Sequence, residues 1–288
     1  MSNFLNKIIS DGFVKGEENI LDKNDLNSLL INIEALISKQ IRENKASPFL
    51  PLVGDNSELD FILEKILTNK YIKEKLELLL GKDYMMMAPT ARISSKGDQG
   101  LELHQDAIGE TGLLFLLTPQ KKGSTVMLRS SHKFPGRIAN YLSWNSKKLV
   151  NLISKISTDI TGDSGDYYFW FHKTWHGRKK NIQKDEKEKY ITLFFPFFPK
   201  KTNRDDVANE NLPYIKKTNN EYLKNLMRLK DKNNHNIKID LPVSLQIEKF
   251  NFKDFFNLNL NFFLIKLILL EIIFFPVRVL RLIKRLRN

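Results

Sequence analysis

Residues 101–118 read LELHQDAIGETGLLFLLT and contain two strand-like runs separated by a glycine-containing turn. In LELHQD, apolar and polar residues alternate, which is the pattern of a strand with one buried face. The second run, GLLFLLT, is almost continuously apolar, as expected for a strand that is buried on both faces. This stretch therefore predicts a fold built from short β-strands.

Similar runs lie on both sides of this stretch. They are YMMMAPTARI (84–93), STVMLRS (124–130), DYYFWFHKTWH (166–176) and KYITLFFPFF (189–198). Before them, helical spacing of apolar residues predicts one helix over 26–41, capped by Asp22 or Asn24, and a second over 58–80 that ends at Gly81. We therefore expect a mainly β, α+β fold: a sandwich or barrel with N-terminal helices packed outside.

The composition is that of a folded protein and excludes several kinds of chemistry. The chain has 288 residues, of which 42% are hydrophobic. It has no cysteine, which excludes disulfides, thiolate zinc sites and thiol catalysis and fits a reducing cytoplasm. The N-terminus lacks the apolar run of a signal peptide. Lys and Arg exceed Asp and Glu by 13 (46 against 33), which favours anionic partners in general. No nucleic-acid-binding motif supports a nucleic-acid partner, so we expect none.

The histidines suggest a metal site. Four of the five fall between His104 and His176. In LELHQD, His104 and Asp106 are two residues apart, so a strand directs both to one face. A non-haem Fe(II) site needs two imidazoles and one carboxylate. From spacing alone, the third ligand is either His172 or His176, and His176 lies nearer the basic turn.

An ordered set of motifs resembles the phytanoyl-CoA dioxygenase family of Fe(II)- and 2-oxoglutarate-dependent oxygenases. The set comprises SDGFVKGEENILDKNDLNSLL, LLLGKDYMMM, LELHQD, GSTVMLRSSHKFPG, GDYYFWFHKTWHGRKKN and KYITLFF, within residues 8–198. The resemblance implies a double-stranded β-helix, which is a jelly roll of cupin-like type. The helical patterns add flanking N-terminal helices and a C-terminal helical extension to this expected fold. It implies that His104, Asp106 and His176 ligate iron.

The co-substrate site departs from the family pattern. The resemblance places an arginine for the far carboxylate of 2-oxoglutarate roughly eleven to thirteen residues after the distal histidine, at the start of a strand, but the chain has Lys187 and Lys189 there. Lys189 is the first choice, since it begins the apolar strand, and Arg178 is a second source of positive charge. The alternative for both lysines is the solvated face of a charged loop. Gln105 and Met86 occupy positions that resemble co-substrate contacts. His132 is expected to have a structural role in the turn around it, and the alternative is a position near the mouth of the pocket.

The resemblance implies hydroxylation of a small-molecule or lipid-like substrate, with O2 consumed and succinate and CO2 as co-products. Related halogenases replace the carboxylate ligand with a small residue, so Asp106 favours hydroxylation. The alternative is a non-catalytic jelly-roll binding module that retains a metal site but lacks effective 2-oxoglutarate turnover, since the family arginine is missing.

The chain divides into a dioxygenase domain (1–200), a polar, partly helical connection (201–253) and an apolar, then basic helical segment (254–288). The apolar run 262–275 is shorter than the roughly 20 residues that span a bilayer. Three interpretations remain for it: a helix packed on the domain, a dimerisation helix, or an in-plane anchor on an anionic membrane surface. We expect a cytoplasmic protein. If the segment is an in-plane anchor, the protein would attach peripherally to the inner face of a membrane and could act on a lipid-linked substrate.

Overall fold

A computed structural model describes most of the chain before residue 229. The described residues are 3–43, 49–95, 98, 100–106, 110–121, 125–133, 157–179, 189–199 and 205–228. Their helices are α1 (Asn3–Asp11), α2 (Lys23–Arg42), α3 (Ser57–Thr68), α4 (Lys70–Leu80), α7 (Asp205–Lys217), α8 (Glu221–Met227) and the short 3-10 helix η1 (Ser131–Lys133).

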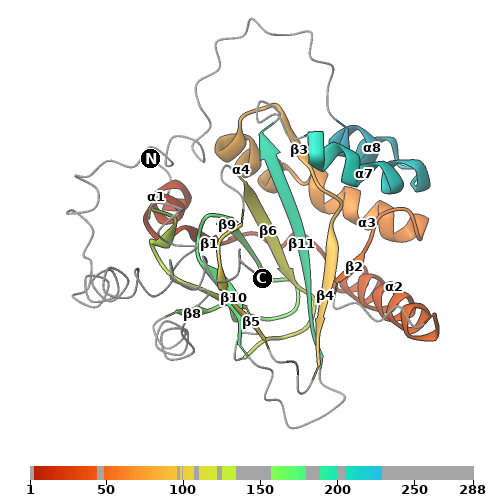
Figure 1. Ribbon diagram of the computed structural model, residues 1–288, viewed down its shortest axis with the longest axis horizontal. Coiled ribbons are helices and arrows are strands. Elements are labelled where there is room, and N and C mark those ends of the chain that lie inside the picture. Colours follow the sequence, from red (N-terminus) through yellow and green to blue (C-terminus); the bar gives the residue numbers. More distant parts are fainter. Residues whose placement is uncertain are drawn as a thin grey trace, which may run out of the picture.

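The strands pair antiparallel in two sheets (Figure 1). The large sheet has the order β1-β9-β6-β11-β4-β2, with β3 also paired to β11, and the small sheet has the order β5-β10-β7-β8. The strands of the large sheet are β1 (Phe13–Lys15), β2 (Phe49–Pro51), β3 (Tyr84–Met86), β4 (Thr90–Ser94), β6 (Thr111–Leu116), β9 (Tyr167–Phe171) and β11 (Tyr190–Pro199). Those of the small sheet are β5 (Leu101–His104), β7 (Thr125–Met127), β8 (Thr158–Asp159) and β10 (His176–Arg178). The two sheets and the helices confirm the expected α+β class.

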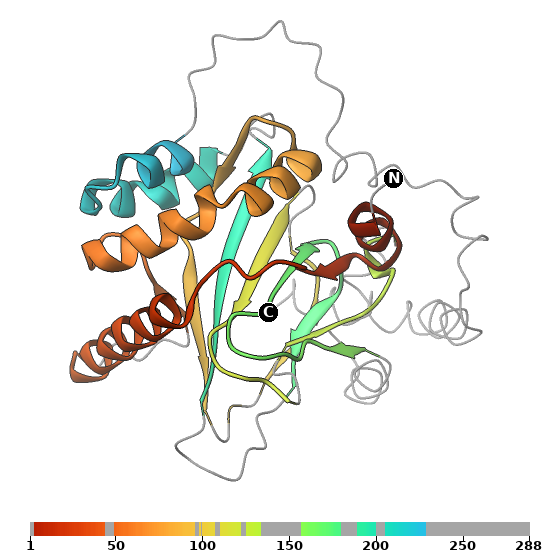
Figure 2. The same ribbon diagram turned by 180° about the vertical axis from the view of Figure 1, so that it is seen from behind.

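One face of the large sheet packs against helices and forms the main core. From β11, Ile191, Leu193, Phe195 and Phe197 enter this core, together with apolar residues of α3 and α4, which lie over the sheet in Figure 2. The opposite face carries a smaller cluster of Phe13, Leu114, Leu116, Met127, Ile160 and Trp170. Because Met127 belongs to the small sheet, this second cluster fills part of the space between the two sheets.

The helix expected over 58–80 is two helices, because Asn69 interrupts it. The Asn69 backbone is not helical (ψ 129°), and its side chain accepts hydrogen bonds from the N–H groups of Tyr71 and Ile72, so it caps α4. Gly81 ends α4 with a positive φ of 81°, as expected. The predicted cap of α2 is Asp22, whose Oδ1 accepts from the N–H groups of the first turn.

The run DYYFWFHKTWH is also divided, since β9 ends at Phe171 and β10 begins at His176 in the other sheet. A turn over 172–175 carries the chain across. The N–H of Thr174 donates to the Phe171 carbonyl at 2.8 Å, and the N–H of Trp175 donates to Ser131 Oγ at 2.8 Å. His172 and His176 therefore lie on different elements and do not share the face of one strand.

Helices α7 and α8 belong to the same compact unit as the sheets. Ile215, Leu223 and Met227 are part of the main core. Asn211 is fully buried, accepts a hydrogen bond from the Ala88 N–H and donates to the carbonyls of Met86 and Met227. The boundary predicted at residue 200 thus does not separate these helices from the sheets. The segment 254–288 lies outside the described residues, among which no helix has the length and apolar character to cross a membrane.

Candidate metal centre

Two histidines face each other across neighbouring strands of the small sheet. His104 ends β5, His176 begins β10, and the two are direct partners in the antiparallel pairing. Side chains directly opposite in a sheet project from the same face. Their ring centroids are accordingly 4.5 Å apart. Strand pairing therefore joins residues that are far apart in the sequence.

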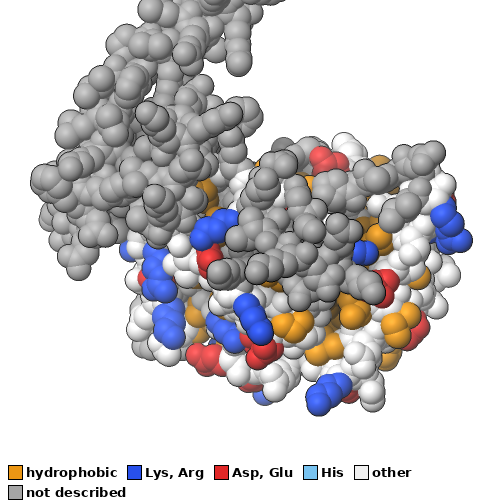
Figure 3. All heavy atoms as spheres, turned by 90° about the horizontal axis from the view of Figure 1, so that it is seen from below, with side chains coloured by type: hydrophobic (Ala, Val, Ile, Leu, Met, Phe, Trp, Pro, Cys, Tyr) orange, Lys and Arg blue, Asp and Glu red, His pale blue; other side chains and the backbone are white. Residues whose placement is uncertain are grey.

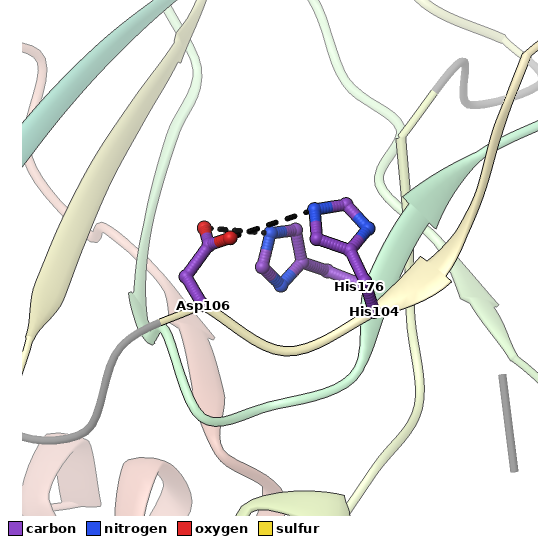
Figure 4. Close-up of side chains that lie close together, drawn as sticks. All are labelled: His104, Asp106 and His176. Atoms are coloured by element: carbon purple, nitrogen blue, oxygen red, sulfur yellow. Dashed lines mark ion pairs between the residues drawn. The ribbon is translucent and has the colours of Figure 1, made fainter. Parts of the chain in front are cut away.

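Asp106 completes the cluster from the segment that follows β5 (Figure 4). Its N–H donates to the His172 carbonyl at 3.1 Å, which fixes the backbone beside the turn before β10. Its Oδ1 lies 3.6 Å from Nε2 of His104, and its Oδ2 lies 3.2 Å from Nε2 of His176. One ligand atom from each of the three residues lies within 4.8 Å of the other two.

The ring of His176 is oriented by a second hydrogen bond. Its Nδ1 lies 2.8 Å from the Thr174 carbonyl, to which it donates. This bond leaves Nε2, the atom that faces Asp106, free to act as a ligand in the neutral ring. Metal-ligating histidines commonly hold their other ring nitrogen in this way, since the bond fixes both tautomer and orientation.

His172 has a different partner and is not in the three-residue cluster. Its Nδ1 lies 2.7 Å from Oε2 of Glu110 and 3.7 Å from Oδ2 of Asp106, and both His172 and Glu110 are buried. The ring stacks on Trp170 at 4.9 Å. Of the two candidates that spacing left open, the structure therefore brings His176 to the aspartate. Sequence reasoning missed Glu110, for which the only signal was an acid beside an apolar run.

The electrostatics of the cluster fit a bound cation. Burial raises the pKa of Asp106, but the hydrogen bond from His176 and the charges of the three histidines lower it more, so the net pKa lies well below its ordinary value. Burial lowers the pKa of His176, and the bond to Asp106 raises it above its ordinary value. A divalent ion and a proton would compete for His176 Nε2. Two imidazole nitrogens and one carboxylate are the donor set of a facial metal triad.

Gln105 and Met86 have structural partners. Gln105 Nε2 donates to the Lys173 carbonyl at 2.5 Å and so holds the turn before β10. Met86 is fully buried in the main core, on the helix-covered side of the large sheet. This location does not match the co-substrate contact expected for Met86.

The basic candidates differ in burial. Arg178 lies two residues beyond His176 on β10, is only 8% exposed, and donates from Nη2 to Asp98 Oδ1 at 2.5 Å. Lys189 is exposed just before β11. Lys189 is two residues before Ile191, so along the strand both point to the side of the sheet that the helices cover. This direction and the exposure of Lys189 argue against the expected contact with 2-oxoglutarate between the sheets. Lys187 lies outside the described residues.

His132 serves the fold, as expected. It is buried, and its Nε2 donates to the Ile9 carbonyl at 3.0 Å, which links η1 to α1.

No protein-family model and no curated protein matches the chain. Solved structures do resemble it. HygX from Streptomyces hygroscopicus, with nickel and 2-oxoglutarate bound, is 14% identical over 69% of this chain and 87% of its own, with a TM-score of 0.54. EctD from S. alaskensis, with 2-oxoglutarate and 5-hydroxyectoine, is 13% identical over 69% and 76%, with a TM-score of 0.54. The non-heme monooxygenase ThoJ, as a nickel complex, is 15% identical over 75% and 96%, with a TM-score of 0.51. At these identities the likeness shows a shared fold.

Proposed function

We propose that this chain is an Fe(II)- and 2-oxoglutarate-dependent dioxygenase that hydroxylates a small-molecule or lipid-like substrate. The observation that carries the proposal is the convergence of His104, Asp106 and His176, with ligand atoms within 4.8 Å of one another. These are the residues that the resemblance to the phytanoyl-CoA dioxygenase family selected, and two imidazoles with one carboxylate suit non-haem Fe(II).

The topology supports a double-stranded β-helix, the jelly roll implied by that resemblance. From β4 to β7 the chain alternates between the large and the small sheet, and it alternates again from β8 to β11. Such a fold buries side chains of both sheets in the space between them. His176 and Trp170, with ring centroids 6.3 Å apart, come from opposite sheets and would form one wall of the site.

The protein residues would position and enclose the reaction. When bound, iron and 2-oxoglutarate would supply the oxidising chemistry, with O2 consumed and succinate and CO2 released. His104, Asp106 and His176 would hold the ion, and the Thr174 carbonyl keeps the His176 ring in the ligating orientation. The apolar cluster around Met127 and Trp170 excludes water from the adjoining space. A carboxylate at position 106 favours hydroxylation over halogenation.

The structural neighbours support the substrate class. HygX has been solved with hygromycin B and 2-oxoglutarate, and EctD with 5-hydroxyectoine, both of which are small molecules. We extend this class to the present chain. The peripheral membrane surface and the lipid-linked substrate remain a proposal that rests on residues 254–288.

The test is metal binding and co-substrate turnover by the full-length protein. We expect one Fe(II) per chain and slow succinate release from 2-oxoglutarate even without substrate. Asp106→Asn should abolish succinate release and weaken metal binding by at least about 10-fold, since it removes the anionic ligand. Asp55→Asn is the matched control, because Asp55 is exposed and is not part of the cluster. Its Oδ1 lies 3.8 Å from Nζ of Lys217. Metal binding that is equal in both variants would refute the ligand assignment.

The exposure of Lys189 favours a second candidate, the non-catalytic binding module. If no other cation takes over the role expected of Lys189, 2-oxoglutarate would bind weakly even at an intact metal site. Stoichiometric Fe(II) binding without succinate release would support this candidate.

A nucleic-acid-binding function has less support. On the face drawn in Figure 3, the basic side chains of the described residues lie among acidic and hydrophobic ones, whereas a nucleic-acid interface gathers them in a patch or stripe.

A further inference from the structure

The strand that should carry the co-substrate cation presents threonine to the space between the sheets. In β11, Ile191 and Leu193 face the helices. Thr192 therefore faces the small sheet, as does Phe194, which packs edge-on against Trp170 at 6.0 Å. Thr192 is buried and accepts a hydrogen bond from Gln120 Nε2 at 3.1 Å. No described residue of β11 is an arginine or lysine.

Arg92 of the neighbouring strand β4 supplies a cation on this face. It is the direct partner of Thr192 in the β4–β11 pairing, whereas Ala91 pairs with Leu193 and enters the helix-side core. Directly paired residues share a face, so Arg92 also faces the small sheet. Its guanidinium lies over the Phe49 ring at 4.5 Å. Its Nε is buried and has no hydrogen-bond partner among the described residues.

Arg178 supplies a second cation from the opposite sheet. It is paired with Thr125, two residues from the His176–Met127 pair, so it shares the face of His176 and Met127. Met127 belongs to the cluster between the sheets. Arg178 is more than nine-tenths buried, yet its Nε and Nη1 have no hydrogen-bond partner among the described residues. Two residues of strand place it about 6.6 Å along β10 from His176.

Asp98 links the two arginines and leaves the group with one net positive charge. It accepts from Nη2 of Arg178 at 2.5 Å. Burial lowers the pKa of Arg92, whereas the charge of Asp98 raises it, so Asp98 lies near enough to Arg92 for the two charges to interact. Two guanidiniums and one carboxylate sum to +1. Buried N–H donors without acceptors are costly and are normally satisfied. The three free donors and the single net charge suit one carboxylate ligand.

We infer that Arg92 and Arg178 together bind the far carboxylate of 2-oxoglutarate in the space between the sheets, with β4 supplying the arginine that β11 lacks. This inference rests on the proposed function and deepens it. A guanidinium fork can bind a carboxylate through two parallel hydrogen bonds, which the exposed Lys189 cannot do. Thr192, the strand partner of Arg92, adds a hydroxyl beside the site.

The test compares two 2-oxo acids on the full-length protein loaded with Ni(II), by isothermal titration calorimetry. The probes are 2-oxoglutarate and 2-oxopentanoate, which has the same chain length but ends in a methyl group. We expect the wild type to prefer 2-oxoglutarate. Arg92→Gln and Arg178→Gln should each weaken 2-oxoglutarate binding about 10- to 100-fold and leave 2-oxopentanoate binding unchanged, since only charge-assisted bonds to the far carboxylate are lost.

Arg129→Gln is the matched control, because Arg129 is exposed and pairs with Asp11 outside this space. Lys189→Gln should leave the preference intact, and a 10-fold loss in that variant alone would return the role to Lys189. If the Gln variants do not fold, Arg92→Met and Arg178→Met replace them, since methionine keeps an unbranched side chain without the charge, and wild-type preference in both would overturn the inference. Absence of Ni(II)-dependent binding of either 2-oxo acid by the wild type would instead overturn the proposed function.

Discussion

The two faces of the large sheet are built from the same strands but carry different chemistry. On the helix-covered face, β11 contributes only apolar residues, such as Leu193 and Phe195, to the main core. On the face toward the small sheet, the same strand places Thr192 beside Arg92. The helix-covered side of β11 therefore contributes packing, whereas its other side places a hydroxyl beside Arg92, whose Nε has no hydrogen-bond partner among the described residues. Stability and ligand binding are separated by the alternation of side chains along a strand.

The largest effect should come from truncating the helix-covered face. Phe195 is fully buried and packs edge-on against Phe115 at 6.2 Å. Phe195→Ala should lower the free energy of unfolding by about 3–5 kcal/mol, because it removes buried apolar surface and leaves a cavity. Urea unfolding of the metal-free protein measures this change. A cost below about 1 kcal/mol would mean that the two faces do not differ as described.

Metal binding at His104, Asp106 and His176, away from the helix-covered face, should also stabilise the protein. At a hundredfold excess over its Kd, Ni(II) should raise the free energy of unfolding by about 2.7 kcal/mol, because it binds only the folded cluster. The stabilisation should be lost in Asp106→Asn and kept in Asp55→Asn. A shift of equal size in both variants would show that the ion binds elsewhere.

The buried side chain of His132, which lies beside α1, should make the free energy of unfolding depend on pH. Burial, helped by the charge of Lys133, lowers the pKa of His132 from 6.5 to about 3. Between these values the unfolded chain binds a proton that the folded chain excludes, so stability falls as the pH drops below about 6.5. The loss down to about pH 5 should be about 2 kcal/mol. The glutamine of His132→Gln does not titrate, so urea unfolding of the wild type and of this variant, at about pH 6.5 and about pH 5, isolates the effect. Parallel losses in the two proteins would contradict the assignment.

The smallest effect should come from Thr192, three residues before Phe195 on the opposite face of β11. Thr192→Val keeps the shape of the side chain but removes the acceptor for Gln120. It should cost about 1 kcal/mol, the net value of one hydrogen bond. The same urea measurement checks this value, and a loss as large as that of Phe195→Ala would show that both faces contribute equally to stability.

Local sequence patterns predicted most of the strands and two members of the candidate metal cluster. Alternation in LELHQD was enough to place His104 and Asp106 together, because they are two residues apart on one segment. The break at Asn69 was missed because its capping hydrogen bonds compete with a helical pattern that continues on both sides. The division of DYYFWFHKTWH was missed because the turn over 172–175 depends on contacts with distant residues, such as Ser131.

By itself, the sequence determined the α+β class, the strand runs, the absence of thiol chemistry and the His104–Asp106 pair, because each follows from composition or from neighbours a few residues apart. The spacing of residues left His172 and His176 both open, and the family resemblance favoured His176. In the tertiary structure it is His176 that lies beside Asp106, because β10 pairs with β5. Likewise, Arg92 has no sequence signal that connects it to Arg178. Both arginines face the space between the sheets because their strands, which belong to different sheets, each turn that side inward, and this arrangement is set by packing of the whole domain.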